Sequence, residues 1–174
     1  MGQTFKTIAT VTVGSGGASS IDFTSIPSTY DDLMILHSIR GSAASNTNSC
    51  NLRFNSATTN YSEKLLYTFG TSVATAGSSN NLIGWIGIPP GNSATASVFG
   101  SGTIYISGYA SSNYKPILTD SASENNATGS NAWAYYSHCA LWSNSSAITS
   151  ISVFPDSGTF LQYSTATLYG IKNS

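Results

Sequence analysis

Apolar and polar residues alternate along most of this chain, which is the pattern of half-buried β-strands. Residues 50–55 alternate without a fault, with Cys50, Leu52 and Phe54 on one side. In residues 103–109 the same alternation turns Ile104 and Ile106 toward a core. We expect about ten strands; the segments that predict them are 5–13, 32–40, 50–55, 64–69, 82–88, 97–106, 115–120, 133–142, 148–154 and 165–171.

Two of these segments carry a further expectation. Residues 32–40 are apolar on both sides, which predicts a strand buried on both faces. A short helix over 31–38 is the alternative for that segment. Pro116 lies near the start of its segment, and because proline cannot donate to a β-ladder, it suggests an edge strand.

Runs of glycine, serine, asparagine and proline separate the apolar segments, as in 14–17, 41–46, 76–81, 89–92 and 124–129. Such runs form turns. Many short strands without helical crossovers indicate antiparallel sheets. The predicted fold class is therefore all-β, an antiparallel two-sheet sandwich of the jelly-roll type with under about 10% helix, in a single domain over 1–174.

Charge is scarce, with six Lys or Arg and seven Asp or Glu among 174 residues and a net charge of −1. The 20 aromatic residues argue against a disordered chain. Six dispersed cations cannot form the basic surface that sequence-independent nucleic-acid binding needs. Net charge near zero promotes association, which a protein inside an assembly tolerates.

The N-terminal residues lack the apolar run of a secretory signal, and no apolar stretch is long enough to span a membrane. Cys50 and Cys139 are therefore expected to be small buried free thiols, made in a reducing cytoplasm. A disulfide is the alternative if the two residues meet in space.

Candidate chemistry is sparse. Most of the seven carboxylates fall in predicted turns, including the pair Asp31 and Asp32. His37, His138 and the two cysteines lack the spacing of zinc ligands, and the adjacent His138 and Cys139 point to opposite faces of a strand. We expect no enzyme, no cofactor and no metal site.

The aromatic residues are the one suggestive group. Alternation leaves Tyr105 and Tyr109 outward beside Ile104 and Ile106. Packing within the sheet is the simplest role for such tyrosines, a protein interface is the second and stacking on a sugar ring is the third. The residues considered as stacking platforms are Trp85, Tyr105, Tyr109, Trp133, Tyr135, Tyr136 and Trp142.

Four short blocks, in order over residues 23–171, resemble a group of small β-sandwich proteins of tailed-phage virions. Residues 23–33 resemble that group's opening block, with Ile-Pro-Ser-Thr-Tyr at its centre. The second block combines 52–55 with 60–62, and the third combines Trp142, 147–151 and Pro155. The closing block covers 164–171 and ends in Leu-Tyr-Gly-Ile, and the chain departs from the group just before it, at Tyr163, where glycine is usual.

The resemblance implies a jelly-roll-like virion protein without enzymatic activity, either a capsid decoration (cement) protein or a tail-fibre domain. Because the chain starts at Met1 without an upstream shaft, decoration is the first hypothesis, a receptor-binding fibre tip the second and a lectin-like glycan binder the third. The expected partner is the major capsid protein, on the outer surface of the head, with the chain as a homotrimer made in the host cytoplasm. No nucleic acid or membrane partner is expected. The candidate interface residues are Tyr105, Tyr109 and the N-terminal segment Met1, Gly2, Gln3, Thr4, Phe5 and Lys6.

Overall fold

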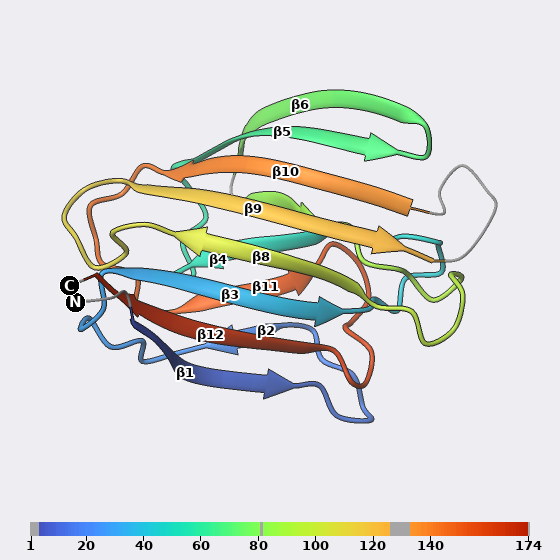
Figure 1. Ribbon diagram of the computed structural model, residues 1–174, viewed down its shortest axis with the longest axis horizontal. Helices are drawn as coiled ribbons and strands as arrows, with labels where there is room; N and C mark the ends of the chain where they lie inside the picture. Colours follow the sequence, from blue (N-terminus) through green and yellow to red (C-terminus); the bar gives the residue numbers. More distant parts are fainter. Residues whose placement is uncertain (1–3, 81, 126–132, 174) are drawn as a thin grey trace.

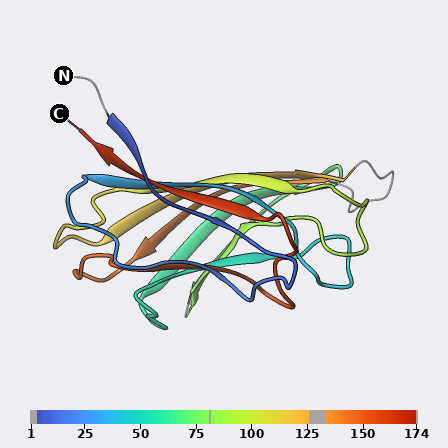
Figure 2. The same ribbon diagram turned by 90° about the horizontal axis from the view of Figure 1, so that it is seen from below.

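The computed structural model describes residues 4–80, 82–125 and 133–173. Within these ranges the chain contains no helix and forms twelve strands in two antiparallel sheets, one of eight and one of four strands. The two sheets lie in separate layers, with the larger sheet above the smaller one in Figure 2. The all-β, two-sheet sandwich predicted from the sequence is confirmed, with twelve described strands where about ten were expected.

Each sheet brings together strands that are distant in the sequence (Figure 1). In spatial order the large sheet contains β1 (Thr4–Thr12), β12 (Thr165–Lys172), β3 (Asp32–Ile39), β8 (Gly100–Ile106), β9 (Lys115–Glu124), β10 (Trp133–Trp142), β5 (Tyr61–Phe69) and β6 (Ser72–Asn80). The small sheet contains β2 (Ile21–Phe23), β11 (Ile151–Pro155), β4 (Cys50–Phe54) and β7 (Ile83–Gly87).

Alternation decides which side chains face the core. Cys50, Leu52, Phe54, Ile104 and Ile106 are all fully buried, as predicted. Strand β3 corrects the expectation of burial on both faces, because its other side lies on the open outer face of the large sheet, where Leu36 is exposed. The alternative of a helix over 31–38 is wrong for the same segment.

Three other local expectations are corrected. The turn expected over 76–81 is wrong for residues 76–80, which belong to β6, a strand whose serine, glycine and alanine residues look like a turn. Strand β2 has only three residues, too few for alternation to predict it. Pro116 lies in a central strand rather than at an edge. Its carbonyl accepts a hydrogen bond from the N–H of Ser107, one residue after the end of β8. The proline nitrogen, which carries no hydrogen to donate, faces this same position, where the β8 ladder has already ended.

Loops complete the core between the sheets. Phe54 packs against the rings of Tyr61 and Trp142, with centroids 6.3 and 5.6 Å away. Buried side chains from connecting segments surround this cluster, and they are Val13, Ile26, Tyr109, Ile148 and Phe160. The interior therefore depends on the loops as well as on the strands.

A layer of polar side chains crosses the inner face of the large sheet. Both oxygens of the Glu63 carboxylate are engaged, since Ser78 donates to Oε1 at 2.6 Å and the Gly84 N–H donates to Oε2 at 2.8 Å. His138 Nε2 lies 3.4 Å from Oε2, and its Nδ1 lies 3.4 Å from the Thr119 hydroxyl. Burial raises the pKa of Glu63, but the hydrogen bonds to His138, Ser78 and Gly84 outweigh it, so this pKa is lowered overall.

His37 belongs to the same layer. A Cβ built on Gly102 would lie 2.5 Å from the His37 Nε2, and a Cβ built on Gly87 would lie 3.2 Å from the Ser121 hydroxyl. Both ring nitrogens of His37 and the Ser121 hydroxyl are buried without a hydrogen-bond partner among the described residues. Burial lowers the pKa of His37 to about 4.

His37 should make stability depend on pH. In the unfolded chain its pKa is about 6.5, so as pH falls from about 6.5 to 4 only the unfolded state takes up this proton, and stability falls by up to roughly 3 kcal/mol. Urea titrations across this pH range should show a shallower decline for His37→Gln than for the unchanged protein. Parallel declines in the two proteins would contradict a buried neutral His37.

The cysteines are free, as predicted, but only one is buried. Cys139 is exposed because the inward position beside it on β10 belongs to His138. Burial raises the pKa of the Cys50 thiol, which disfavours the reactive thiolate.

A thiol reagent should therefore count one cysteine in the folded protein and two after unfolding without a reductant. The fast thiol should disappear in Cys139→Ser and persist in Cys50→Ser. A count of zero in the unfolded protein would mean that the two residues form a disulfide.

Candidate functional site

The outer face of the large sheet is the broadest candidate binding surface. Four large side chains on it are each between 44% and 49% exposed: Leu36, Leu66, Leu118 and Tyr135. The register places Leu36, Thr103, Asp120, Ser137 and Leu66 in one row across five strands. Leu118 and Tyr135 lie in the rows on either side. Across these three described rows the charged side chains are Lys64 and Asp120, so the face is nearly neutral.

Tyr105 faces outward on this sheet, as expected, but it is half-buried. Its hydroxyl donates a hydrogen bond of 2.6 Å to Oδ2 of Asp32. This hydrogen bond, together with burial, raises the pKa of Tyr105 to about 12. The ring contributes to the outer face, while its hydroxyl is engaged within the protein.

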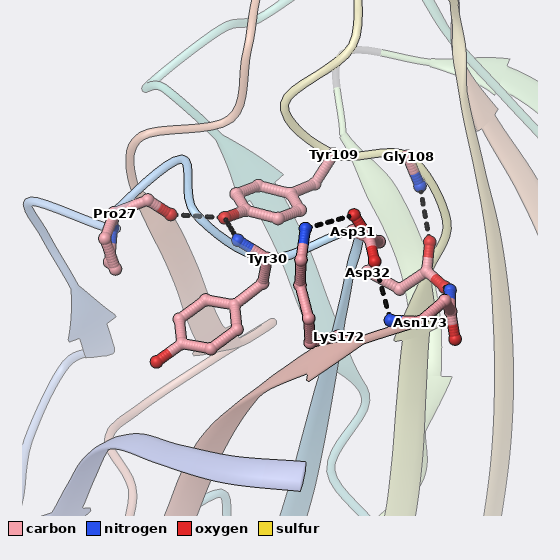
Figure 3. A network of polar contacts seen from close by, with 8 residues as sticks. All are labelled: Pro27, Tyr30, Asp31, Asp32, Gly108, Tyr109, Lys172 and Asn173. Carbon is pink, nitrogen blue, oxygen red and sulfur yellow. Dashed lines mark hydrogen bonds and ion pairs between the residues drawn. The ribbon is translucent and has the colours of Figure 1, made fainter. Parts of the chain in front are cut away.

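Tyr109 corrects the expectation of an outward ring, because it is fully buried. Strand β8 ends at Ile106, and Gly108 then adopts a left-handed conformation with φ +57°, so the strand alternation does not continue to residue 109. The Tyr109 hydroxyl donates to the Pro27 carbonyl and accepts from the Tyr30 N–H at 3.4 Å (Figure 3). Tyr109 therefore joins two loops and is withdrawn from any interface.

Asp31 and Asp32 tie the start of β3 to the end of β12 (Figure 3). Asp31 accepts from Lys172 Nζ at 2.9 Å and from the Asn173 N–H at 2.6 Å, and the hydrogen bond to Lys172 is the main cause of its lowered pKa. Asp32 accepts from the Gly108 N–H at 2.8 Å. Burial raises the pKa of Asp32, but its hydrogen bonds outweigh that effect and lower it. The two carboxylates hold strand ends together.

The N-terminal candidate segment is described in part. Met1, Gly2 and Gln3 lie outside the described residues. Thr4, Phe5 and Lys6 begin β1, an edge strand of the large sheet, and all three are exposed, Phe5 to 52%. They stay a predicted contact segment.

The aromatic residues considered as platforms separate in the structure. Trp142 stacks on Tyr61 within the core, Tyr135 lies on the outer face, and Trp133 begins β10. Trp85 and Tyr136, by contrast, line one pocket together with Tyr67 and Phe69, which sequence reasoning did not single out. Alternation does mark Tyr67 and Phe69 as inward residues of β5, but only the tertiary fold places Trp85 opposite them.

The four sequence blocks meet in pairs at the ends of neighbouring strands. A Cβ built on Gly170, in the closing block, would lie 2.3 Å from the Tyr30 ring of the opening block. Asn55, in the second block, accepts at Oδ1 from the N–H groups of Thr149 and Ser150 in the third, at 2.9 and 3.0 Å. The departure at Tyr163 does not remove the turn, because Tyr163 itself adopts φ +72°.

Among the described residues, no three His, Cys, Asp or Glu side chains lie close enough together to hold a metal ion. Those same residues include no helix that could cross a membrane. No family model, curated protein or solved structure matches this chain.

The loop contact of Tyr109 can be tested against a matched exposed tyrosine. Tyr109→Phe removes a part-buried hydrogen bond to the Pro27 carbonyl and the acceptor of the Tyr30 N–H, which should cost about 0.5–1.5 kcal/mol of unfolding free energy. Tyr114→Phe removes a hydroxyl from a ring that is 58% exposed, and it should change stability by less than about 0.5 kcal/mol. Equal effects in urea denaturation would show that the Tyr109 hydroxyl does not hold these loops.

Proposed function

We propose that this protein is a structural component of a tailed-phage virion that decorates the outside of the head as a homotrimer bound to the major capsid protein. The observation that carries the proposal is the open outer face of the eight-stranded sheet, with Leu36, Leu66, Leu118 and Tyr135 partly exposed in a nearly neutral surface. The phage context comes from the resemblance of the four sequence blocks.

The composition of this face suits a protein partner. The buried centres of protein interfaces are poor in charge and rich in aromatic residues and methionine. On the outer face, Asp120 already accepts a hydrogen bond from the Tyr135 hydroxyl at 3.1 Å, so one of its carboxylate oxygens has a partner within the chain. Binding would rest on shape and apolar contact, and affinity should change little with salt.

The resemblance and the surface contribute different parts of the proposal. The sequence blocks meet at the ends of the sandwich and hold its loops, as Tyr30 on Gly170 and Asn55 on 149–150 illustrate. None of the four exposed residues of the outer face lies in a block. The blocks support a shared fold, and the outer face supplies the residues that would recognise a particular capsid.

Leu118→Asp should weaken binding to assembled heads at least tenfold, since it places a carboxylate at the centre of an apolar contact. Tyr114→Asp is the matched control, because it also replaces a large exposed side chain, but in the loop before β9. Copies bound per head can be counted after co-sedimentation at low and high salt. Equal loss in both variants, or a steep salt dependence, would contradict docking through the outer face.

Cryo-electron microscopy of the virions tests the location directly. Sandwich-shaped density in groups of three over the icosahedral shell is the expected result. Density confined to the tail would replace decoration by the receptor-binding fibre hypothesis. Purified virions without this chain would overturn the virion role.

A further inference from the structure

A pocket of about 480 Å³ opens at one end of the sandwich, on the inner side of the large sheet. Its size falls within the range of about 300–1,000 Å³ typical of small-molecule sites. Tyr67 and Tyr136 form one wall, with ring centroids 5.2 Å apart and planes inclined by 13°. The remaining lining consists of Phe69, Trp85, Ile88 and the hydroxyl residues Thr47 and Ser49.

This pocket belongs to a second apolar cluster, separate from the main core. Leu65, Ile88, Ala134 and Tyr136 form the cluster, with Tyr67 and Phe69 packed against it. Three aromatic residues, Tyr67, Phe69 and Tyr136, therefore belong both to this apolar cluster and to the pocket lining. A preformed aromatic wall of this kind binds a flat apolar surface with little loss of side-chain freedom.

Trp85 is held at this pocket by an irregular strand. Between the pairs Cys50–Gly87 and Leu52–Ile83, three residues of β7 lie opposite one residue of β4, which is a bulge. Trp85 lies inside the bulge with φ +52°, a left-handed conformation that bulky residues avoid. It is 43% exposed, while Gly84 and Ile86 on either side are buried. The bulge therefore presents a large ring to solvent at a cost in backbone strain.

The lining also limits the kind of ligand. The described residues around the pocket offer aromatic rings and hydroxyl groups and no charged side chain. Burial raises the pKa of Tyr136, so its phenol stays protonated. Such a site suits a neutral ligand. One face of the ligand should be apolar, to pack on the aromatic rings, and its hydroxyl groups should form hydrogen bonds with Thr47 and Ser49.

We propose that this pocket binds one pyranose ring of a neutral saccharide. The apolar C–H face of the sugar would pack on Trp85, and its hydroxyls would exchange hydrogen bonds with Thr47 and Ser49. The site goes beyond the proposed docking function and does not depend on it, because the pocket and the outer face share no residue. With one ring bound, Kd should be on the order of 1 mM.

Saturation-transfer NMR and tryptophan fluorescence can test this with glucose, galactose, mannose, N-acetylglucosamine and their disaccharides. We expect at least one neutral sugar to bind and Trp85→Gly to raise its Kd at least tenfold. Glycine tolerates φ +52°, so the fold should persist. Tyr163→Gly is the matched control, because Tyr163 is also aromatic, 68% exposed and left-handed, but lies in the turn before β12.

A second variant tests the hydroxyl contacts without removing a ring. Thr47→Val keeps the shape of the side chain and should weaken binding about three- to tenfold. Leu118→Asp should leave sugar binding unchanged, and Trp85→Gly should leave head binding unchanged, so the two proposals fail separately. No response to any neutral sugar, undiminished binding by Trp85→Gly, or stronger binding of sialic or glucuronic acid would overturn the proposed site.

Discussion

An eight-stranded sheet packs on a four-stranded one, and this difference in width shapes the rest of the structure. At about 4.8 Å between strands, the large sheet is roughly 34 Å across and the small one roughly 14 Å. The small sheet cannot bury the inner face by itself, so loop residues such as Ile26, Tyr109 and Phe160 complete the core. The hydroxyl of Tyr109 and the carboxylates of Asp31 and Asp32 then hold the loops that contain Ile26 and Tyr109, at the end where β12 finishes.

The same mismatch explains why the interior is not uniform. Where the edge strand β7 passes over the large sheet, Gly84 and Gly87 allow close approach, and the side chains beneath them are polar, notably Glu63 and Ser121. This polar layer separates the main core from the aromatic cluster at the end of β5. An apolar cluster that the small sheet does not fully cover is left as a pocket, with Trp85 partly exposed at it.

How much the sequence could predict depended on how local each feature is. Alternation in 50–55 and at Ile104 and Ile106 identified buried positions, because the period of a strand is a local property. The orientation of Tyr109 could not be obtained this way, since the glycine at 108 ends the alternation one residue earlier. Strand β6 has too few apolar residues for alternation to predict it. It forms because β5 pairs with it along nine residues. The pocket depends on β5, β7 and β10 meeting, which no single segment encodes.

Among the described residues, the aromatic residues Trp85 and Tyr163 adopt left-handed backbone conformations, and they do so in different settings. Tyr163 lies in a turn where its N–H donates to the Val13 carbonyl at 3.0 Å. Closing the turn accounts for its conformation. Trp85 lies within a strand, where regular pairing would give an ordinary extended backbone. Its conformation belongs to the bulge of β7, which places an indole ring at the edge of an aromatic pocket. Backbone strain of this kind clusters at ligand-binding sites, and its position beside the pocket is one of the observations behind the saccharide proposal.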